Sequence, residues 1–167
     1  MSLSRASRGR RGTRAAAVSQ AWALTVACMQ IETGPVAHPT MFEPDDPVLA
    51  DLRRICLRLP GAAEKVSHGR PCFYTKKIFA IYGATTKGDH ESGRYDASVV
   101  IQAQPDEAVA LLATPSYFIP AYWGPYGWIG LNLAGGEVDW DEVGELVTES
   151  FRLTAPATLV ARLAPGA

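Results

Sequence analysis

The stretch from Ser67 to Gly83, SHGRPCFYTKKIFAIYG, gathers the side chains best suited to chemistry. His68 and Cys72 lie four positions apart. A histidine that lies beside a cysteine in the fold can act as the general base that activates the thiol as a nucleophile. The sequence offers no third residue to orient the histidine, and Cys72 opens a predicted strand whose alternate side chains are buried. We therefore predict no catalytic residue here and favour a non-enzymatic protein, with an enzyme of unidentified class as an alternative.

Metal and cofactor motifs do not stand out in the sequence. Cys56, His68, Cys72 and His90 do not have the spacing of zinc ligands. GxSxG, HExxH, phosphate-binding glycine loops and the dinucleotide fingerprint are missing. We predict neither a metal nor a cofactor. Cys28 is the third cysteine of the chain, and an odd set without a CxxC pair indicates reduced thiols in a cytoplasmic protein.

Basic residues in and after this stretch form a candidate nucleic-acid contact. Cations clustered on one surface bind phosphates. The candidates are Arg70, Lys76, Lys77, Lys87 and Arg94. Asp89, Glu91 and Asp96 are interspersed with them, so an ordinary set of solvated, charged turns is the competing interpretation.

An aromatic tract, SYFIPAYWGPYGW (116–128), forms the second candidate site. Exposed rings stack on nucleic-acid bases or line a small-molecule pocket. Tyr122, Trp123 and Tyr126 are the candidates for such a surface, and Tyr126 falls at a predicted turn. Phe118 and Trp128 are predicted to fill the core instead.

Charge is distributed unevenly along the chain. Residues 1–40 carry five arginines and one acid, whereas residues 41–167 carry 11 basic and 16 acidic residues, a net charge of −5. A domain that binds DNA usually carries more basic than acidic residues. No apolar run reaches the 18 or more residues of a membrane span, so no membrane association is expected.

The first forty residues differ from the rest of the sequence. Their Arg- and Ala-rich composition predicts a disordered extension or a start codon assigned too early, since Met41 opens a plausible N-terminus. A secretory signal is the alternative, although Ser19, Gln20 and Thr25 interrupt its apolar part. Residues 41–167 are predicted to form one domain.

Hydrophobic spacing predicts the elements that must position these residues. Three helices are expected at 47–59, 104–115 and 139–153, each with a capping residue or a proline at its start, and a short one at 155–163. Three strands are expected at 72–75, 78–83 and 97–103, and a hairpin at 116–133 that turns at 124–127. Residues 84–96 are polar and glycine-containing and predict a long loop.

The resulting order is α-β-β-β-α-β-β-α, followed by the short terminal helix. Short links between successive strands predict antiparallel pairing. The sequence therefore predicts a two-layer α+β domain with helices on one face of the sheet. Gly69, Pro71, Phe73 and Trp128 are expected to play structural parts in it.

Several motifs resemble the MmcQ/YjbR family of small bacterial proteins over residues 47–163. They are LPGAAEKVSHGRPCF, the Phe79-Ala80 pair, PDEAVALL, GWIGLNL and VGELVTESFRLTAPATLVARL. The resemblance implies the same element order, no attached enzymatic activity, and DNA binding through two projecting hairpins. The extension before Met41 has no counterpart in the family pattern.

Two functional hypotheses follow. The first is a non-enzymatic protein that binds DNA weakly and without sequence preference through its basic hairpin turns. The second is a module that binds a small molecule or a protein through the aromatic tract.

Overall fold

A computed structural model describes residues 39–163, all of which belong to the unit Ala37–Ala167. The predictions made for residues 1–38 lie outside the described residues. In chain order the elements are α2 (Pro47–Cys56), β1 (Ala63–Ser67), β2 (Arg70–Tyr74), β3 (Ile78–Tyr82), β4 (Ser98–Gln102), α3 (Pro105–Leu111), β5 (Tyr117–Phe118), a 3-10 helix η1 (Gly124–Tyr126), β6 (Trp128–Asn132), α4 (Trp140–Thr154) and α5 (Ala157–Val160).

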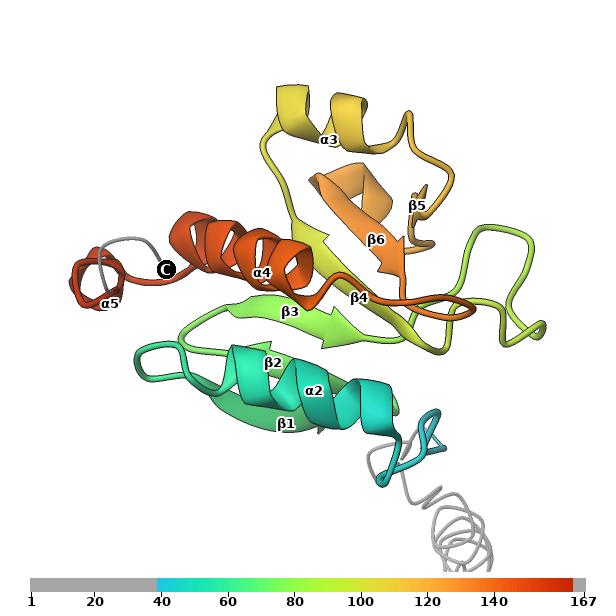
Figure 1. The fold of residues 1–167 in the computed structure, drawn as a ribbon, viewed down its shortest axis with the longest axis horizontal. Helices are drawn as coiled ribbons and strands as arrows, with labels where there is room; N and C mark the ends of the chain where they lie inside the picture. The colour runs from blue at the N-terminus through green and yellow to red at the C-terminus, as the bar shows by residue number, and fades with distance from the viewer. Residues whose placement is uncertain (1–38, 164–167) are drawn as a thin grey trace, which may run out of the picture. The chain divides into compact units, whose positions relative to one another are not determined.

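The strands form one antiparallel sheet in the order β1-β2-β3-β4-β6-β5 (Figure 1). Consecutive strands are neighbours from β1 to β4 because short turns or one loop join them. The chain then leaves the sheet through α3 and returns so that β6 lies next to β4 and β5 forms the far edge. This arrangement confirms the α+β class.

Strand β1 was not predicted, and it makes the observed order α-β-β-β-β-α-β-β-α-α. Its sequence, AEKVS, has no aromatic residue and only one β-branched residue, Val66, so it gives a weak strand signal. The strand forms because it pairs with β2 along its whole length, and its position at the sheet edge is compatible with charged side chains. Arg53 of α2 fixes it from one side, with Nε and Nη2 donating to the Glu64 carboxylate over 2.9–3.1 Å.

The helix starts follow the predicted capping chemistry. The Asp46 carboxylate accepts a 2.8 Å hydrogen bond from the amide of Val48, and Pro47 occupies the first helical position. Asp139 caps α4 by accepting from the amides of Asp141 and Glu142. The Glu142 carboxylate accepts from the Tyr117 hydroxyl at 2.7 Å, an interaction that links the start of α4 to β5.

The four α-helices of residues 39–163 contribute to one apolar core on one face of the sheet, as predicted, α2 and α4 with buried side chains and α3 and α5 with half-buried ones. Leu49 and Leu52 of α2 and Val147 and Phe151 of α4 are fully buried there, against sheet residues such as Phe73. α2 and α4 lie across this face in Figure 1. No helix between residues 39 and 163 combines the length and apolar character needed to cross a membrane.

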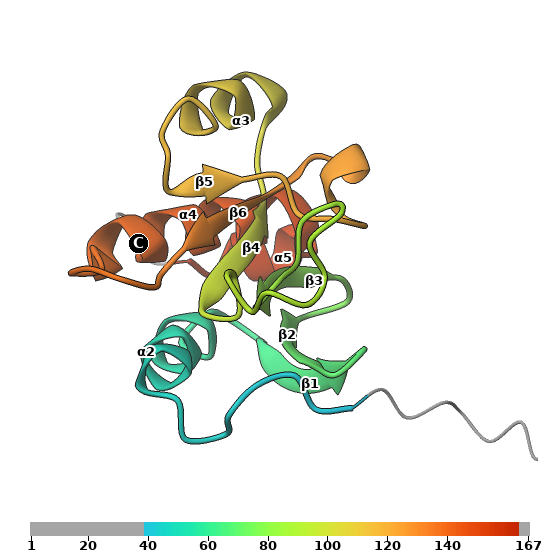
Figure 2. The same cartoon turned by 90° about the vertical axis from the view of Figure 1, so that its right-hand side faces the viewer.

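The opposite face of the sheet has a smaller apolar cluster that loops cover. Cys72, Ile81, Val100 and Trp128 point to this side. The polar segment 84–96 joins β3 to β4, as predicted, and in Figure 2 it extends toward the segment that follows β5. The Ala121 amide donates to the Thr85 carbonyl oxygen at 2.7 Å, so the two covering segments are joined.

Candidate functional site

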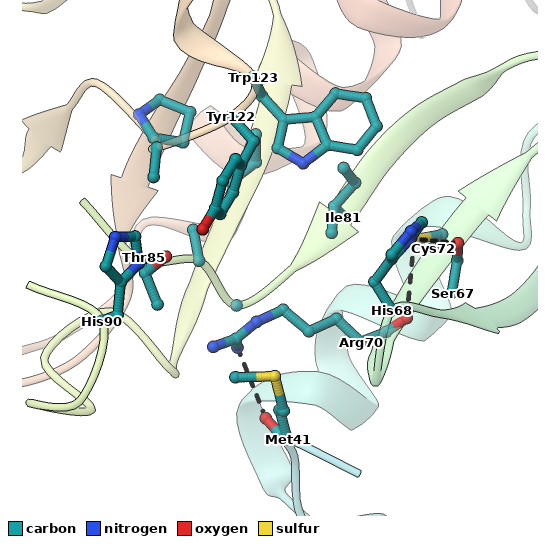
Figure 3. Close-up of a pocket in the computed structure, with 15 residues that line it drawn as sticks. Met41, Ser67, His68, Arg70, Cys72, Ile81, Thr85, His90, Tyr122 and Trp123 are labelled. Carbon is teal, nitrogen blue, oxygen red and sulfur yellow. Dashed lines mark hydrogen bonds between the residues drawn. The ribbon is translucent and has the colours of Figure 1, made fainter. Parts of the chain in front are cut away.

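A pocket of about 580 Å³ lies on the loop-covered face of the sheet (Figure 3). Its floor comes from β2, β3 and β4, and its walls come from the β1–β2 turn, the 84–96 loop and the segment between β5 and β6. The lining residues are Met41, Ser67, His68, Arg70, Cys72, Ile81, Gly83, Ala84, Thr85, His90, Val100, Pro120, Ala121, Tyr122 and Trp123.

The β1–β2 turn places His68 at the rim. His68 and Gly69 both have positive φ, 52° and 77°, as the central residues of a type I′ hairpin turn do. A Cβ at position 69 would overlap the carbonyl oxygen of Pro39, so glycine is required there. The Ser67 hydroxyl and His68 Nδ1 lie 3.1 Å apart, and this contact orients the imidazole.

Arg70 is a buried charged residue of the pocket, with 9% of its surface exposed. Nη2 donates to Asp96 Oδ1 at 3.0 Å, and Nη1 donates to the carbonyl oxygen of Met41 at 3.5 Å. Gly83 has a φ of 74°, and a Cβ there would overlap Nη1 of Arg70. The glycine thus gives the guanidinium room at the end of β3.

The floor of the pocket is apolar. Cys72, Ile81 and Val100 are each at most 4% exposed, and they come from neighbouring strands. Burial raises the pKa of the Cys72 thiol from 9.0 to about 11. At neutral pH the thiol is therefore protonated and poorly suited to act as a nucleophile.

Aromatic side chains form one wall of the pocket. Trp123 is half-buried and packs on Trp128, with ring centroids 5.3 Å apart and the rings tilted by 55°. Tyr122 is 75% exposed and stacks on His90 at 5.8 Å. His90 Nδ1 lies 3.3 Å from the Thr85 hydroxyl, which joins this stack to the loop.

The five predicted phosphate-binding residues do not share one surface. Lys76 and Lys77 are exposed in the turn between β2 and β3. Lys87 and Arg94 are exposed in the loop at the other end of β3, and a five-residue strand spans about 17 Å. Arg70 is buried in the pocket, where it forms an ion pair with the half-exposed Asp96. The spacing of these cations in the sequence does not reveal that they lie at opposite ends of β3.

The predicted aromatic residues divide into two groups. Tyr122 and Trp123 line the pocket, whereas Tyr126 is 73% exposed on η1 and is not among the lining residues. Trp128 is 8% exposed and Phe118 is 7% exposed, as expected of core residues. The hairpin predicted at 116–133 is present, with η1 at its predicted turn.

Of the residues predicted to be structural, Gly69 and Pro71 are buried beside the turn, and Phe73 is fully buried in the larger core.

Sequence reasoning missed several pocket residues. The sequence gives Ser67 no role and suggests His68 only for catalysis or zinc binding. Thr85 and His90 fall in the predicted polar loop, and His90 is otherwise weighed only as a zinc ligand. Gly83, the last residue of a predicted strand, is the one signal in the sequence that another group approaches the backbone closely. Within residues 39–163, no three His, Cys, Asp or Glu side chains are arranged to hold a metal ion.

Comparison with protein-family models shows the family of this chain. The YjbR family model matches residues 57–153, more than half of the chain. The chain belongs to the YjbR family. No curated protein and no solved structure matches it. In this YjbR chain the matched segment runs from the end of α2 into α4 and contains every pocket residue except Met41.

Proposed function

We propose that this YjbR-family protein binds a small molecule in the pocket on the loop-covered face of its sheet. The observation that carries the proposal is the combination of an apolar floor with a buried arginine that opens into the same space. Small-molecule sites are typically pockets of about 300–1,000 Å³ with apolar walls and a few convergent polar groups. The pocket of about 580 Å³ fits this description.

A binding role fits the pocket better than a catalytic one. Cys72 is the most nucleophilic side chain on the floor, and burial keeps it protonated. The other groups on the polar side, Ser67, His68, Thr85 and His90, come from a turn and a loop and are suited to hydrogen bonding with a ligand.

The proposal can be tested with a library of small aromatic fragments. We expect some of them to change the amide chemical shifts of pocket residues such as Ile81, Val100 and Trp123 in two-dimensional NMR. Ala121→Trp should abolish these changes because the new ring would fill the pocket from its wall. Ala113→Trp is the matched control, since Ala113 is exposed and does not line the pocket.

Shift changes that map to another surface, or that persist in Ala121→Trp, would contradict the proposal.

DNA binding, which the family resemblance implied, is a second candidate. The observation that favours it is the exposed position of Lys76 and Lys77 at a hairpin turn, where no carboxylate of residues 39–163 forms an ion pair with them. Such a turn can reach a phosphate without rearrangement. The separation of these lysines from Lys87 and Arg94 limits the number of contacts that one duplex can make.

A further inference from the structure

Among residues 39–163, Arg70 is the only lysine or arginine that lines the pocket. Its side chain is 10% exposed, while its partner Asp96 is 54% exposed. A charged group removed from water is costly unless hydrogen bonds and opposite charges compensate it. Asp96 gives this compensation from the solvent side, which leaves the inner side of the guanidinium facing the pocket.

The guanidinium has hydrogen-bonding capacity to spare. It carries five N–H donors. Among residues 39–163, Nη2 has one partner, Asp96, and Nη1 reaches Met41 only at 3.5 Å, the limit of a hydrogen bond. In Figure 3 the guanidinium projects into the same space as the hydroxyl end of Tyr122. A ligand in the pocket therefore meets free donors in a planar fork.

Charge and geometry specify the anion. One cation, already shared with Asp96, suits a group with a single negative charge better than a phosphate with two. A carboxylate matches the planar fork of an arginine with two parallel hydrogen bonds.

The remaining walls specify the body of the ligand. Ile81 and Val100 form an apolar floor, and the half-buried indole of Trp123 lies in the wall. Aromatic rings are well accommodated beside such an indole because they stack on or pack against its faces. Tyr122 and His90, stacked on each other, border the same space.

We propose that the pocket binds a small aromatic carboxylate, whose carboxylate accepts hydrogen bonds from Arg70 and whose ring lies among Ile81, Val100 and Trp123. This inference rests on the proposed function and adds the chemical class of the ligand. Gly83 belongs to the site because its missing side chain makes room for the guanidinium.

A matched pair of probes tests the inference on the full chain. 1-Naphthoate and 1-naphthamide have similar shapes, but only the first carries a charge. We expect naphthoate to bind about tenfold more tightly in NMR titrations, the effect of one charge-assisted hydrogen-bonded pair. Arg70→Gln should remove this preference. Arg94→Gln, which removes an exposed cation from the nearby loop, should leave it unchanged.

A second variant keeps the test valid if Arg70→Gln does not fold. Asp96 is half-exposed, so Asp96→Asn is expected to fold. Removing its negative charge should raise the affinity for naphthoate about threefold or more, because the carboxylates of Asp96 and of naphthoate compete for the guanidinium of Arg70. The affinity for naphthamide should not change.

The outcomes separate the two proposals. Equal binding of both probes in the pocket, or no effect of Asp96→Asn on naphthoate, would overturn the carboxylate inference and leave the pocket as a binding site. If no probe or fragment changes the shifts of pocket residues, the proposed function itself fails.

Discussion

At the scale of single residues, two neighbouring aromatic side chains have opposite environments. Trp128 is 8% exposed and packs with Phe118 and Trp123 on the loop-covered face, whereas Tyr126 is 73% exposed on η1. We expect Trp128→Ala to lower the free energy of unfolding by about 3–5 kcal/mol, the range for a buried large aromatic residue. Tyr126→Ala should change it by less than about 0.5 kcal/mol.

Urea denaturation of both variants measures these differences. Equal losses would contradict the burial of Trp128 and the exposure of Tyr126.

The Cys72 thiol gives a pH-dependent prediction. Burial raises its pKa from 9.0 to about 11. The folded state therefore favours the protonated thiol, and its contribution to stability is complete below about pH 9 and is lost as the pH rises from about 9 to 11. Alkylation by iodoacetamide needs the thiolate, so Cys72 should react more slowly at pH 8 than a free cysteine does.

Peptide mapping by mass spectrometry distinguishes Cys72 from Cys56, whose pKa burial raises as well. The rate at Cys72 should increase steeply up to about pH 11. A rate at pH 8 equal to that of free cysteine would show that the thiol is not desolvated.

At the scale of secondary-structure elements, Ser150 joins α4 to the sheet. Its buried hydroxyl donates to the Phe79 carbonyl oxygen at 2.6 Å and accepts from the Gln102 amide at 2.9 Å. β3 pairs with β4 from Ala80↔Ile101 to Tyr82↔Val99, so Phe79 and Gln102 would be the next pair in the same register. The serine hydroxyl bridges this last position of the ladder.

Ser150→Ala should leave both backbone groups without a partner. Buried polar groups left unpaired cost about 1–3 kcal/mol, and we expect a loss of stability in this range. Ser92→Ala is the matched control because its hydroxyl bonds Asp89 in an exposed loop. Thermal unfolding of the two variants provides the comparison, and equal melting temperatures would contradict the bridging role.

The elements differ in how well the sequence predicts them. α2 and α4 were predictable because their apolar residues repeat at helical spacing, and β2 to β4 because they are rich in branched and aromatic residues. β1 was not, since a polar edge strand is stabilised by its neighbours and by Arg53 rather than by its own composition. The same holds for the pocket: Arg70 begins β2, Gly83 follows β3 and Asp96 precedes β4, so these three residues meet only because the strands pair in this order.

At the scale of the whole molecule, the acidic balance of residues 41–167 bears on DNA binding. Net negative charge gives no long-range attraction to a polyanion. Any binding should be weak and depend on two to four phosphate contacts, with a slope of log affinity against log salt of about −2 to −4. A chain that begins at Ala37, without the arginines of the first forty residues, allows the measurement by mobility shift.

Lys76→Glu combined with Lys77→Glu should abolish this binding without unfolding the domain, because both side chains are exposed in a turn. The double replacement of Lys87 and Arg94 by glutamate is the control with the same change in charge, at the other end of β3. An unchanged affinity in the Lys76 and Lys77 variant, or no binding even at low salt, would exclude the hairpin turn as a DNA contact.

The sheet order also has a consequence for folding kinetics. Strands β1 to β4 are neighbours in sequence and in space, so residues 63–102 can pair through contacts of short sequence separation, which generally form early. β6 reaches β4 only after the chain has passed through α3 and β5, and the wall with Tyr122 and Trp123 arrives with it. The floor of the pocket should therefore form before its aromatic wall, and the ability to hold a ligand should be acquired late in folding.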